Sequence, residues 1–169
     1  MTTTPDEHKR DAPLRVRCAA VTISDTRTRE TDSGGRELAD RLQQAGHEVV
    51  AREIIPDEPD RIRQLLVSLA QRTDLDAVLV TGGTGIAPRD HTFEVVNSLL
   101  TKALPGYGEL FRMLSYAEIG AAAMLSRTTG GLMGRVVVLT MPGSRAAVRL
   151  ALEQIIVPEL GHLVREARR

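Results

Sequence analysis

The sequence predicts an α/β fold, a three-layer sandwich in which a mostly parallel sheet carries helices on both faces. Two observations lead to this prediction. Strand-like and helix-like segments alternate along the chain, and the strand-like segments are almost continuously apolar, as in strands that are covered on both faces. The chain has 169 residues, a length typical of one domain. We expect that domain to span residues 14–169, after a polar, disordered tail of residues 1–13.

The first half of the chain alternates between the two patterns. A β-branched and Ala-rich strand is expected at 16–23, a second at 48–55 and a short buried one at 77–80. Gly46 ends the first helix, and Pro59, at a first helical position, begins the second. Each helix is predicted by apolar residues at helical spacing: Leu38, Leu42 and Ala45 in the first, Ile62, Leu65, Leu66 and Leu69 in the second, and Phe93, Val96, Leu99 and Leu100 in the third.

The second half is less regular. Pro105 and Gly106 break the chain before a helix that contains Phe111, and residues 125–132 are ambiguous, with a strand and a turn around Gly130 and Gly131 as one interpretation. Residues 136–139 are four consecutive β-formers. A turn at 141–144 leads into a long final helix, which we expect Pro158 to kink or split.

Composition favours a small-molecule site. Lys plus Arg and Asp plus Glu number 22 each, and aromatic residues make up 2% of the chain, so neither a basic field nor stacking rings indicate a nucleic-acid partner. No apolar stretch approaches the ~20 residues of a membrane span. The single cysteine, Cys18, lies in an apolar run and is expected to be a buried, unreactive thiol. A cytoplasmic protein without a membrane partner is the expectation.

The strongest local signal is the glycine-rich segment Thr81-Gly82-Gly83-Thr84-Gly85, directly after a predicted strand. Three glycines in four positions let successive backbone N–H groups converge and let a phosphate approach closely. The alternative is a tight turn, which one glycine would satisfy. The segment has neither the Lys of a Walker A loop nor the spacing of a dinucleotide-binding fingerprint. We therefore predict an anion site.

Other polar loops follow strands, and parallel topology gathers them at the same edge of the sheet. Pro142-Gly143-Ser144 and Asp32-Ser33-Gly34-Gly35 each precede a helix, where they either cap it or offer N–H groups to an anion. The acids Asp25, Asp57 and Asp90 on this edge suggest a divalent cation such as Mg²⁺, bridged to substrate phosphates. Candidates to neutralise phosphate are the guanidinium groups of Arg89, Arg112 and Arg127.

Taken together, these motifs resemble the molybdopterin adenylyltransferase family of molybdenum cofactor biosynthesis, also called the molybdopterin-binding domain, and in particular its shorter branch. The resemblance covers about residues 16–160. It rests on the order of seven motifs: Ser24-Asp25-Thr26, Asp32-Ser33-Gly34, Ile55-Pro56-Asp57-Glu58, the glycine segment with Arg89-Asp90, Pro105-Gly106-Tyr107-Gly108-Glu109, Leu125-Ser126-Arg127 and Pro142-Gly143-Ser144.

The resemblance implies a nucleotidyltransferase that binds molybdopterin and, with ATP and Mg²⁺, attaches AMP to the terminal phosphate of the pterin. It implies that Asp57 and Asp90 are catalytic and hold Mg²⁺. It also implies a homotrimer or homohexamer, with other proteins of the pathway as partners. The ligand-binding positions that it implies are Ser24, Asp25, Ser33, Gly34, Thr81, Gly82, Gly83, Thr84, Gly85, Glu109, Ser126, Arg127, Pro142, Gly143 and Ser144.

Two alternatives stay open from the sequence. One is a non-catalytic molybdopterin-binding or carrier protein of the same pathway, because some members of the shorter branch bind the pterin without clear transferase activity. The other is a module that binds a different nucleotide or sugar phosphate.

Overall fold

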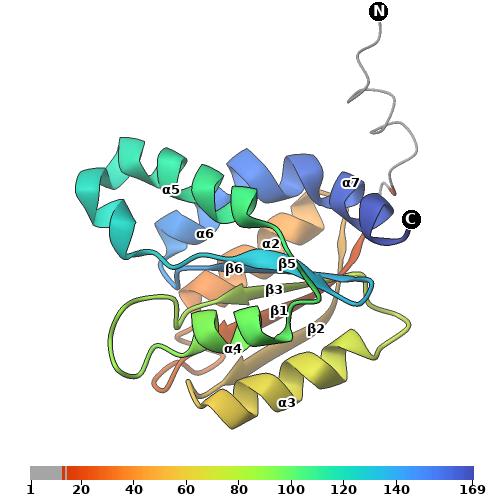
Figure 1. Ribbon diagram of the computed structural model, residues 1–169, viewed down its shortest axis with the longest axis horizontal. Helices are drawn as coiled ribbons and strands as arrows, with labels where there is room; N and C mark the ends of the chain where they lie inside the picture. Colours follow the sequence, from red (N-terminus) through yellow and green to blue (C-terminus); the bar gives the residue numbers. More distant parts are fainter. Residues whose placement is uncertain (1–12, 14) are drawn as a thin grey trace, which may run out of the picture.

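The computed structural model describes residues 13 and 15–169, and its centre is a six-stranded sheet of order β2-β1-β3-β6-β5-β4 (Figure 1). Neighbouring strands among β2, β1, β3 and β6 pair in parallel, whereas β5 pairs antiparallel with both β6 and β4. The mostly parallel sheet predicted from the sequence is thus confirmed. The strands are β1 (Arg17–Ile23), β2 (Glu48–Ile55), β3 (Ala77–Thr81), β4 (Lys102–Ala103), β5 (Gly130–Met133) and β6 (Val136–Met141).

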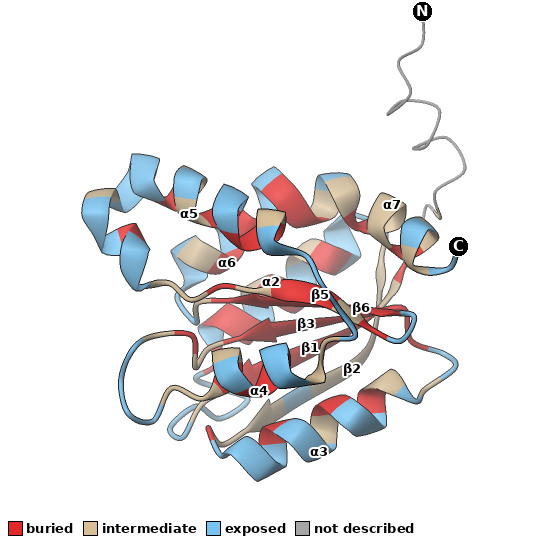
Figure 2. Cartoon of the chain, viewed as in Figure 1, coloured by how far each residue is buried: buried red, intermediate tan, exposed pale blue. Residues whose placement is uncertain are grey.

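Helices cover both faces of the sheet, so the three-layer prediction is confirmed (Figure 1). One face carries α2 (Ser33–Gln44), α5 (Pro105–Ile119), α6 (Arg145–Ala151) and α7 (Val157–Ala167), and the other carries α3 (Pro59–Ala70) and α4 (Thr92–Leu99). The helices turn their buried stripes toward the sheet, and the opposite sides are exposed (Figure 2). Among the described residues, no helix is both long and apolar enough to cross a membrane.

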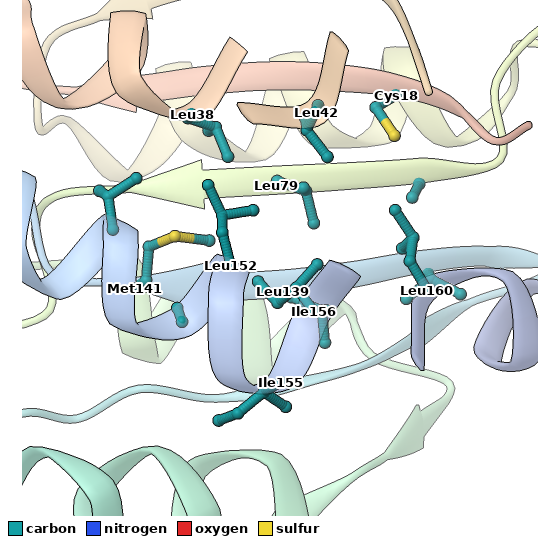
Figure 3. Packing of buried hydrophobic residues seen from close by; sticks show 14 of the residues in the cluster. Cys18, Leu38, Leu42, Leu79, Leu139, Met141, Leu152, Ile155, Ile156 and Leu160 are labelled. Carbon is teal, nitrogen blue, oxygen red and sulfur yellow. The ribbon is translucent and has the colours of Figure 1, made fainter. Parts of the chain in front are cut away.

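The apolar core consists of two clusters separated by the sheet. In the larger one, Leu38 and Leu42 of α2 pack over the central strands beside Leu79 and Leu139 (Figure 3). All four are 0% exposed, and burying each contributes about 1.5–3 kcal/mol. Cys18 is equally buried, and burial raises the pKa of its thiol to about 12. The buried thiol expected from the sequence is therefore confirmed, and at neutral pH it is protonated and unreactive.

The final helix is interrupted, as its proline predicts. A π-helical turn, η2 (Leu152–Ile156), separates α6 from α7, and Pro158 lies in the first turn of α7. Proline has no N–H group and clashes with the carbonyl four residues earlier. The wider π turn before it accommodates this loss without ending the helix.

The segment before β6 contains a strand, as one interpretation of residues 125–132 had it, but its turn is not at Gly130 and Gly131. Both glycines lie inside β5, and the hairpin turn follows at Gly134, whose φ is +60°. A Cβ at Gly131 would lie 2.2 Å from the carbonyl oxygen of Lys102, so the glycine allows close strand pairing. The two-residue strand β4 and the 3₁₀ segment η1 (Gly120–Leu125) were not predicted.

Candidate functional site

The predicted loops meet where the order of the strands reverses. From β1 the chain runs to β2 on one side and then returns to β3 on the other. The crevice beyond the carboxyl ends of β1 and β3 is thus a topological switch point, where open α/β sheets bind ligands. Thr22 pairs with Thr81, and Thr81 with Met141. The three strands therefore end level, and the glycine segment emerges between the loops that follow β1 and β6.

Two glycines of this segment adopt backbone conformations that other residues avoid. The φ angle is +98° at Gly82 and +63° at Gly83. A Cβ on Gly82 would lie 2.2 Å from the carbonyl oxygen of Ile23, so space as well as backbone conformation requires glycine there. The turn is thus built from more than the single glycine that a simple turn needs.

The loop forms a cradle lined by unpaired amides, the kind of site predicted for an anion. The N–H of Gly82 donates to the carbonyl of Met141 at 3.0 Å. Within residues 13 and 15–169, the next three amides, of Gly83, Thr84 and Gly85, donate to no protein acceptor. Thr84 is only 4% exposed, and buried N–H groups are nearly always paired in folded proteins. Three successive free donors in one tight turn are the arrangement that binds a phosphate or another anion.

The turn after β6 forms the opposite wall of the cradle. The Thr81 hydroxyl donates to the carbonyl of Pro142 at 3.0 Å. A Cβ on Gly34 would lie 2.7 Å from the carbonyl oxygen of Gly143, so the start of α2 packs directly on this turn. The structure therefore brings together the second, fourth and seventh motifs of the predicted site.

One cavity adjoins this wall, and a second cavity lies next to the first. One, of about 410 Å³, is lined by Gly82, Gly83, Thr84, Gly85, Asp90, Ile119, Ala122, Leu125, Ser126, Pro142 and Gly143. The other, of about 480 Å³, is lined by Phe93, Asn97, Ala103, Pro105, Glu109, Arg112, Met124, Ser126, Arg127, Thr128 and Thr129. Ser126 lines both, so the two hollows are neighbours on one surface.

Asp57 lies behind the glycine loop. It is 7% exposed, and its Oδ1 accepts a hydrogen bond from the backbone N–H of His91 at 3.1 Å. Burial raises the pKa of Asp57, and the negative charges of Asp90 and Asp25 raise it further, against the opposing effect of the hydrogen bond from His91. A raised carboxyl pKa in a crevice is typical of functional sites.

Asp25 has the opposite environment. Its Oδ1 accepts from the backbone N–H of Asp57 at 3.0 Å, and its Oδ2 pairs with Arg89 at 2.8 Å. These contacts, the backbone hydrogen bond first, lower the pKa of Asp25. The hydroxyl of Ser24 shapes the same loop by accepting from the amides of Thr26 and Arg27. Asp25 is therefore placed to fix the chain around Asp57.

Asp90 stands at the far end of the loop. Its Oδ2 accepts from the N–H of Ala87 at 2.8 Å, and a Cβ on Gly85 would lie 2.6 Å from the same oxygen. Since Gly85 has no side chain, the Asp90 carboxylate can lie directly against the loop that carries the free amides.

Arg127 holds the loop through its backbone and its side chain. Its N–H donates to the carbonyl of Thr84, its Nε to that of Gly85 at 2.7 Å and one terminal nitrogen to that of Asp90 at 2.9 Å. The other terminal nitrogen pairs with Glu94. Every nitrogen of this guanidinium thus has a partner within the protein.

The helix-start motifs act as caps. Asp32 accepts from the N–H of Gly35 at 2.8 Å, and Ser144 accepts from the N–H of Ala147 at 3.2 Å. Asp32 also accepts from the hydroxyl of Thr22 and from Arg52, so it is fully engaged. Ser33 is exposed in the first turn of α2.

The predicted residues are thus divided among three places. The glycine loop, Asp90, Ser126, Pro142 and Gly143 share the first cavity, whereas Glu109 and Arg127 face the second. Asp57 lies against the loop beside Gly83, Asp25 contacts the backbone of Asp57, and Ser24 shapes the loop that carries Asp25. Sequence reasoning missed Thr92, a buried polar residue beside Asp57, and Ile119, which with Leu125 of the sixth motif forms an apolar wall of the first cavity. Neither belongs to a motif that precedes or follows a predicted strand.

The fold and the loop define a class of protein, an α/β domain with a glycine-rich loop that carries free amides at the switch point of its sheet. Residues 19–162 match the family described as "Probable molybdopterin binding domain", and the chain belongs to this family. It is 54% identical over 164 residues to molybdenum cofactor biosynthesis protein B of Bacillus cereus, an alignment that covers 96% of this chain and 97% of the relative.

Solved structures agree with this assignment. A crystal structure of a molybdenum cofactor biosynthesis protein B superposes with a TM-score of 0.90 at 53% identity and covers 94% of this chain and 99% of that one. The molybdopterin biosynthesis enzyme MoaB of Thermus thermophilus gives a TM-score of 0.80 at 36% identity, with 90% and 96% coverage. Family and fold, both expected from the sequence, are therefore confirmed.

Proposed function

We propose that this protein binds molybdopterin and transfers AMP from ATP to the terminal phosphate of the pterin. The observation that carries the proposal is the row of three free amides at Gly83, Thr84 and Gly85, between the two acids Asp57 and Asp90. Membership of the molybdopterin-binding family supplies the pterin as the ligand.

The two cavities suit the two ends of such a ligand. The glycine-loop cavity offers N–H donors to phosphate groups. The second combines the ring of Phe93 and the side chain of Met124 with the carboxylate of Glu109 and the guanidinium of Arg112. Apolar walls with a few polar groups are typical of sites for a flat heterocycle. Ser126, on both cavities, lies where the linkage between ring and phosphate would pass.

The acids fit a magnesium ion held mainly by substrate. Residues 13 and 15–169 contain no cluster of three or more His, Cys, Asp or Glu side chains that would hold a metal on its own. Mg²⁺ usually takes one or two carboxylates and completes its shell with phosphates and water. Asp57 and Asp90, both against the glycine loop, supply that number of carboxylates. When bound there, Mg²⁺ would neutralise negative charge on the phosphates.

The proposed reaction needs positioning more than covalent catalysis. A terminal oxygen of the pterin phosphate attacks the α-phosphorus of ATP, a new P–O bond forms, and the bond to the β-phosphate breaks to release pyrophosphate. A phosphate monoester is largely ionised at neutral pH, so no general base is required. The loop amides would hold the attacking phosphate in line, which is the main task of proteins in such transfers.

An adenylylation assay tests the proposal. The protein is incubated with molybdopterin, ATP and Mg²⁺, and pyrophosphate and adenylylated pterin are measured. We expect Asp57→Asn and Asp90→Asn to suppress product while pterin binding persists. Asp74→Asn is the matched control, because Asp74 is 56% exposed and lies just before the amino end of β3, the opposite edge of the sheet. No product from folded wild-type protein would refute the transferase assignment.

Calorimetry separates the alternatives. Tight pterin binding without ATP-dependent product identifies a binding or carrier protein of the same pathway. Equal affinity for a sugar phosphate or another nucleotide identifies a general phosphate-binding module.

We also propose that the protein assembles into a homotrimer or homohexamer. Large apolar side chains are exposed along α5 and η1, and surfaces of this kind often mark contacts between proteins. Ile119 and Leu125 belong both to this surface and to the glycine-loop cavity, so a neighbouring copy would lie beside the site. The surface consists of Leu104, Leu110, Met113, Tyr116, Ile119, Met124 and Leu125.

A further inference from the structure

The hydroxyl of Thr92 is buried without a partner. Thr92 is the first residue of α4 and is 0% exposed. Its Oγ1 makes no hydrogen bond in the described part of the chain. A buried hydroxyl in this state is unfavourable, because it has given up hydration and gained nothing in exchange. Since few such groups occur in folded proteins, each one calls for an explanation.

The hydroxyl faces an acceptor that also has no partner. A Cβ on Gly83 would lie 2.2 Å from Thr92 Oγ1 and 2.4 Å from Asp57 Oδ2, so both oxygens face the same point beside the glycine loop. Asp57 Oδ1 accepts from His91, whereas Oδ2 accepts no hydrogen bond from any described residue. The unpaired hydroxyl of Thr92, a donor, thus lies beside the unpaired Oδ2 of Asp57, an acceptor.

The backbone of Thr92 is fixed to the same loop. Its N–H donates to the carbonyl of Gly83 at 3.1 Å, and its position at the start of α4 limits its movement. Because both oxygens lie close to the same point beside Gly83, side-chain rotation can bring them into contact.

We propose that Thr92 is a positioning residue for Asp57: when phosphates and their cation occupy the glycine loop, Thr92 Oγ1 donates a hydrogen bond to Asp57 Oδ2 and holds the carboxylate toward them. This inference rests on the proposed function for the identity of the ligand. The unpartnered hydroxyl then costs stability in the free protein and contributes affinity in the complex. A threonine with a purely structural role would show neither the cost in stability of the free protein nor the gain in affinity of the complex.

The first measurement is thermal unfolding of the protein without ligand. Valine matches threonine in shape and lacks the hydroxyl, so we expect Thr92→Val to raise the midpoint by about 2 °C. Thr140→Val is the matched control. Thr140 is also 0% exposed, but its hydroxyl donates to the carbonyl of Thr129 and accepts from the N–H of Thr129. We expect that variant to unfold at a lower temperature.

The second measurement is binding of Mn²⁺ and ATP, followed by electron paramagnetic resonance of the free Mn²⁺ and by calorimetry. We expect Thr92→Val to weaken binding by about tenfold, because a hydrogen bond to a charged group is lost. Thr92→Ser restores the hydroxyl and should recover most of the affinity.

Two outcomes would overturn the inference. A Thr92→Val protein as destabilised as Thr140→Val would show that the hydroxyl already has a structural partner. A stable Thr92→Val protein that binds Mn²⁺ and ATP like the wild type would show that the hydroxyl does not act on the site. If the wild type binds both but forms no adenylylated pterin, the proposed function fails, whereas the binding data still decide the role of Thr92.

Discussion

Replacing Arg127 with methionine removes the guanidinium that ties the glycine loop to the rest of the site. The side chain is 25% exposed, donates to the carbonyls of Gly85 and Asp90 at 2.7 and 2.9 Å, and lies 5.2 Å from the ring centre of Phe93. We expect this change to loosen the loop without disturbing the core, since Arg127 belongs to neither apolar cluster.

The magnitude follows from these contacts. Each hydrogen bond contributes about 1 kcal/mol once water can reach the freed carbonyls, and the ring contact adds about 0.5 kcal/mol. The ion pair with Glu94 adds little, because Glu94 is 57% exposed. The loss is then about 2–3 kcal/mol, which lowers the unfolding midpoint by about 4–12 °C for a domain of this size.

Thermal unfolding and hydrogen exchange of residues 84–90 measure the effect. Arg89→Met is the matched control, since Arg89 is 65% exposed and pairs only with the partly exposed Asp25 among the described residues. We expect the control to change the midpoint by about 2 °C or less. The role of Arg127 in holding the loop is refuted if Arg127→Met matches Arg89→Met in both the unfolding midpoint and the hydrogen exchange of the loop.

Other substitutions test the remaining features. Asp57→Asn should raise the free energy of unfolding at pH 7, because burial holds the pKa of Asp57 above its value in the unfolded chain, and the charged carboxylate costs stability once pH exceeds both values. This gain in stability should fade below about pH 4, near the pKa of Asp57 in the unfolded chain. Urea titrations at pH 7 and pH 3.5 measure it, and a gain that is absent at pH 7 or larger at pH 3.5 would contradict the prediction. Gly82→Ala, with its Cβ against the Ile23 carbonyl, should cost about 3 kcal/mol or more. Gly106→Ala should leave stability unchanged or raise it, because Gly106 lies in a helix and an added Cβ would meet no other atom. Equal urea midpoints for Gly82→Ala and Gly106→Ala would contradict this difference. Met113→Glu, at a side chain that is 61% exposed, should dissociate the proposed assembly but keep the fold. Light scattering that finds the same mass as for the wild type would exclude this surface as the contact.

Much of the fold could be predicted from the sequence because its strands are long and apolar. The run around Val21 and the β-formers around Val138 mark strands that are covered on both faces, and the helices carry clear apolar periodicity. Gly130 and Gly131 misled the prediction, since glycine serves both turns and close strand pairing. The strand that begins at Lys102 has two residues, too few to show any alternation.

The site was only partly predictable for a related reason. Parallel topology places the loops after β1, β3 and β6 on one edge, so sequence patterns suffice to gather them. Which amides stay free, and which side chains lie behind the loop, depends on contacts between distant segments. Thr92 and Asp57 are 35 positions apart in the chain, and no local pattern indicates that their oxygens share one side of Gly83. The partners of Arg127 likewise come from the loop 37–43 positions before it.

The shared wall at Ser126 also matters for the design of inhibitors. A small anionic fragment seated on the loop amides and a flat fragment seated beside Phe93 would occupy separate hollows with this one residue between them. Joining two such fragments across Ser126 makes the second binding event intramolecular, so the linked compound should gain affinity far beyond either part. The length of the linker is then the main variable that a chemist would need to optimise.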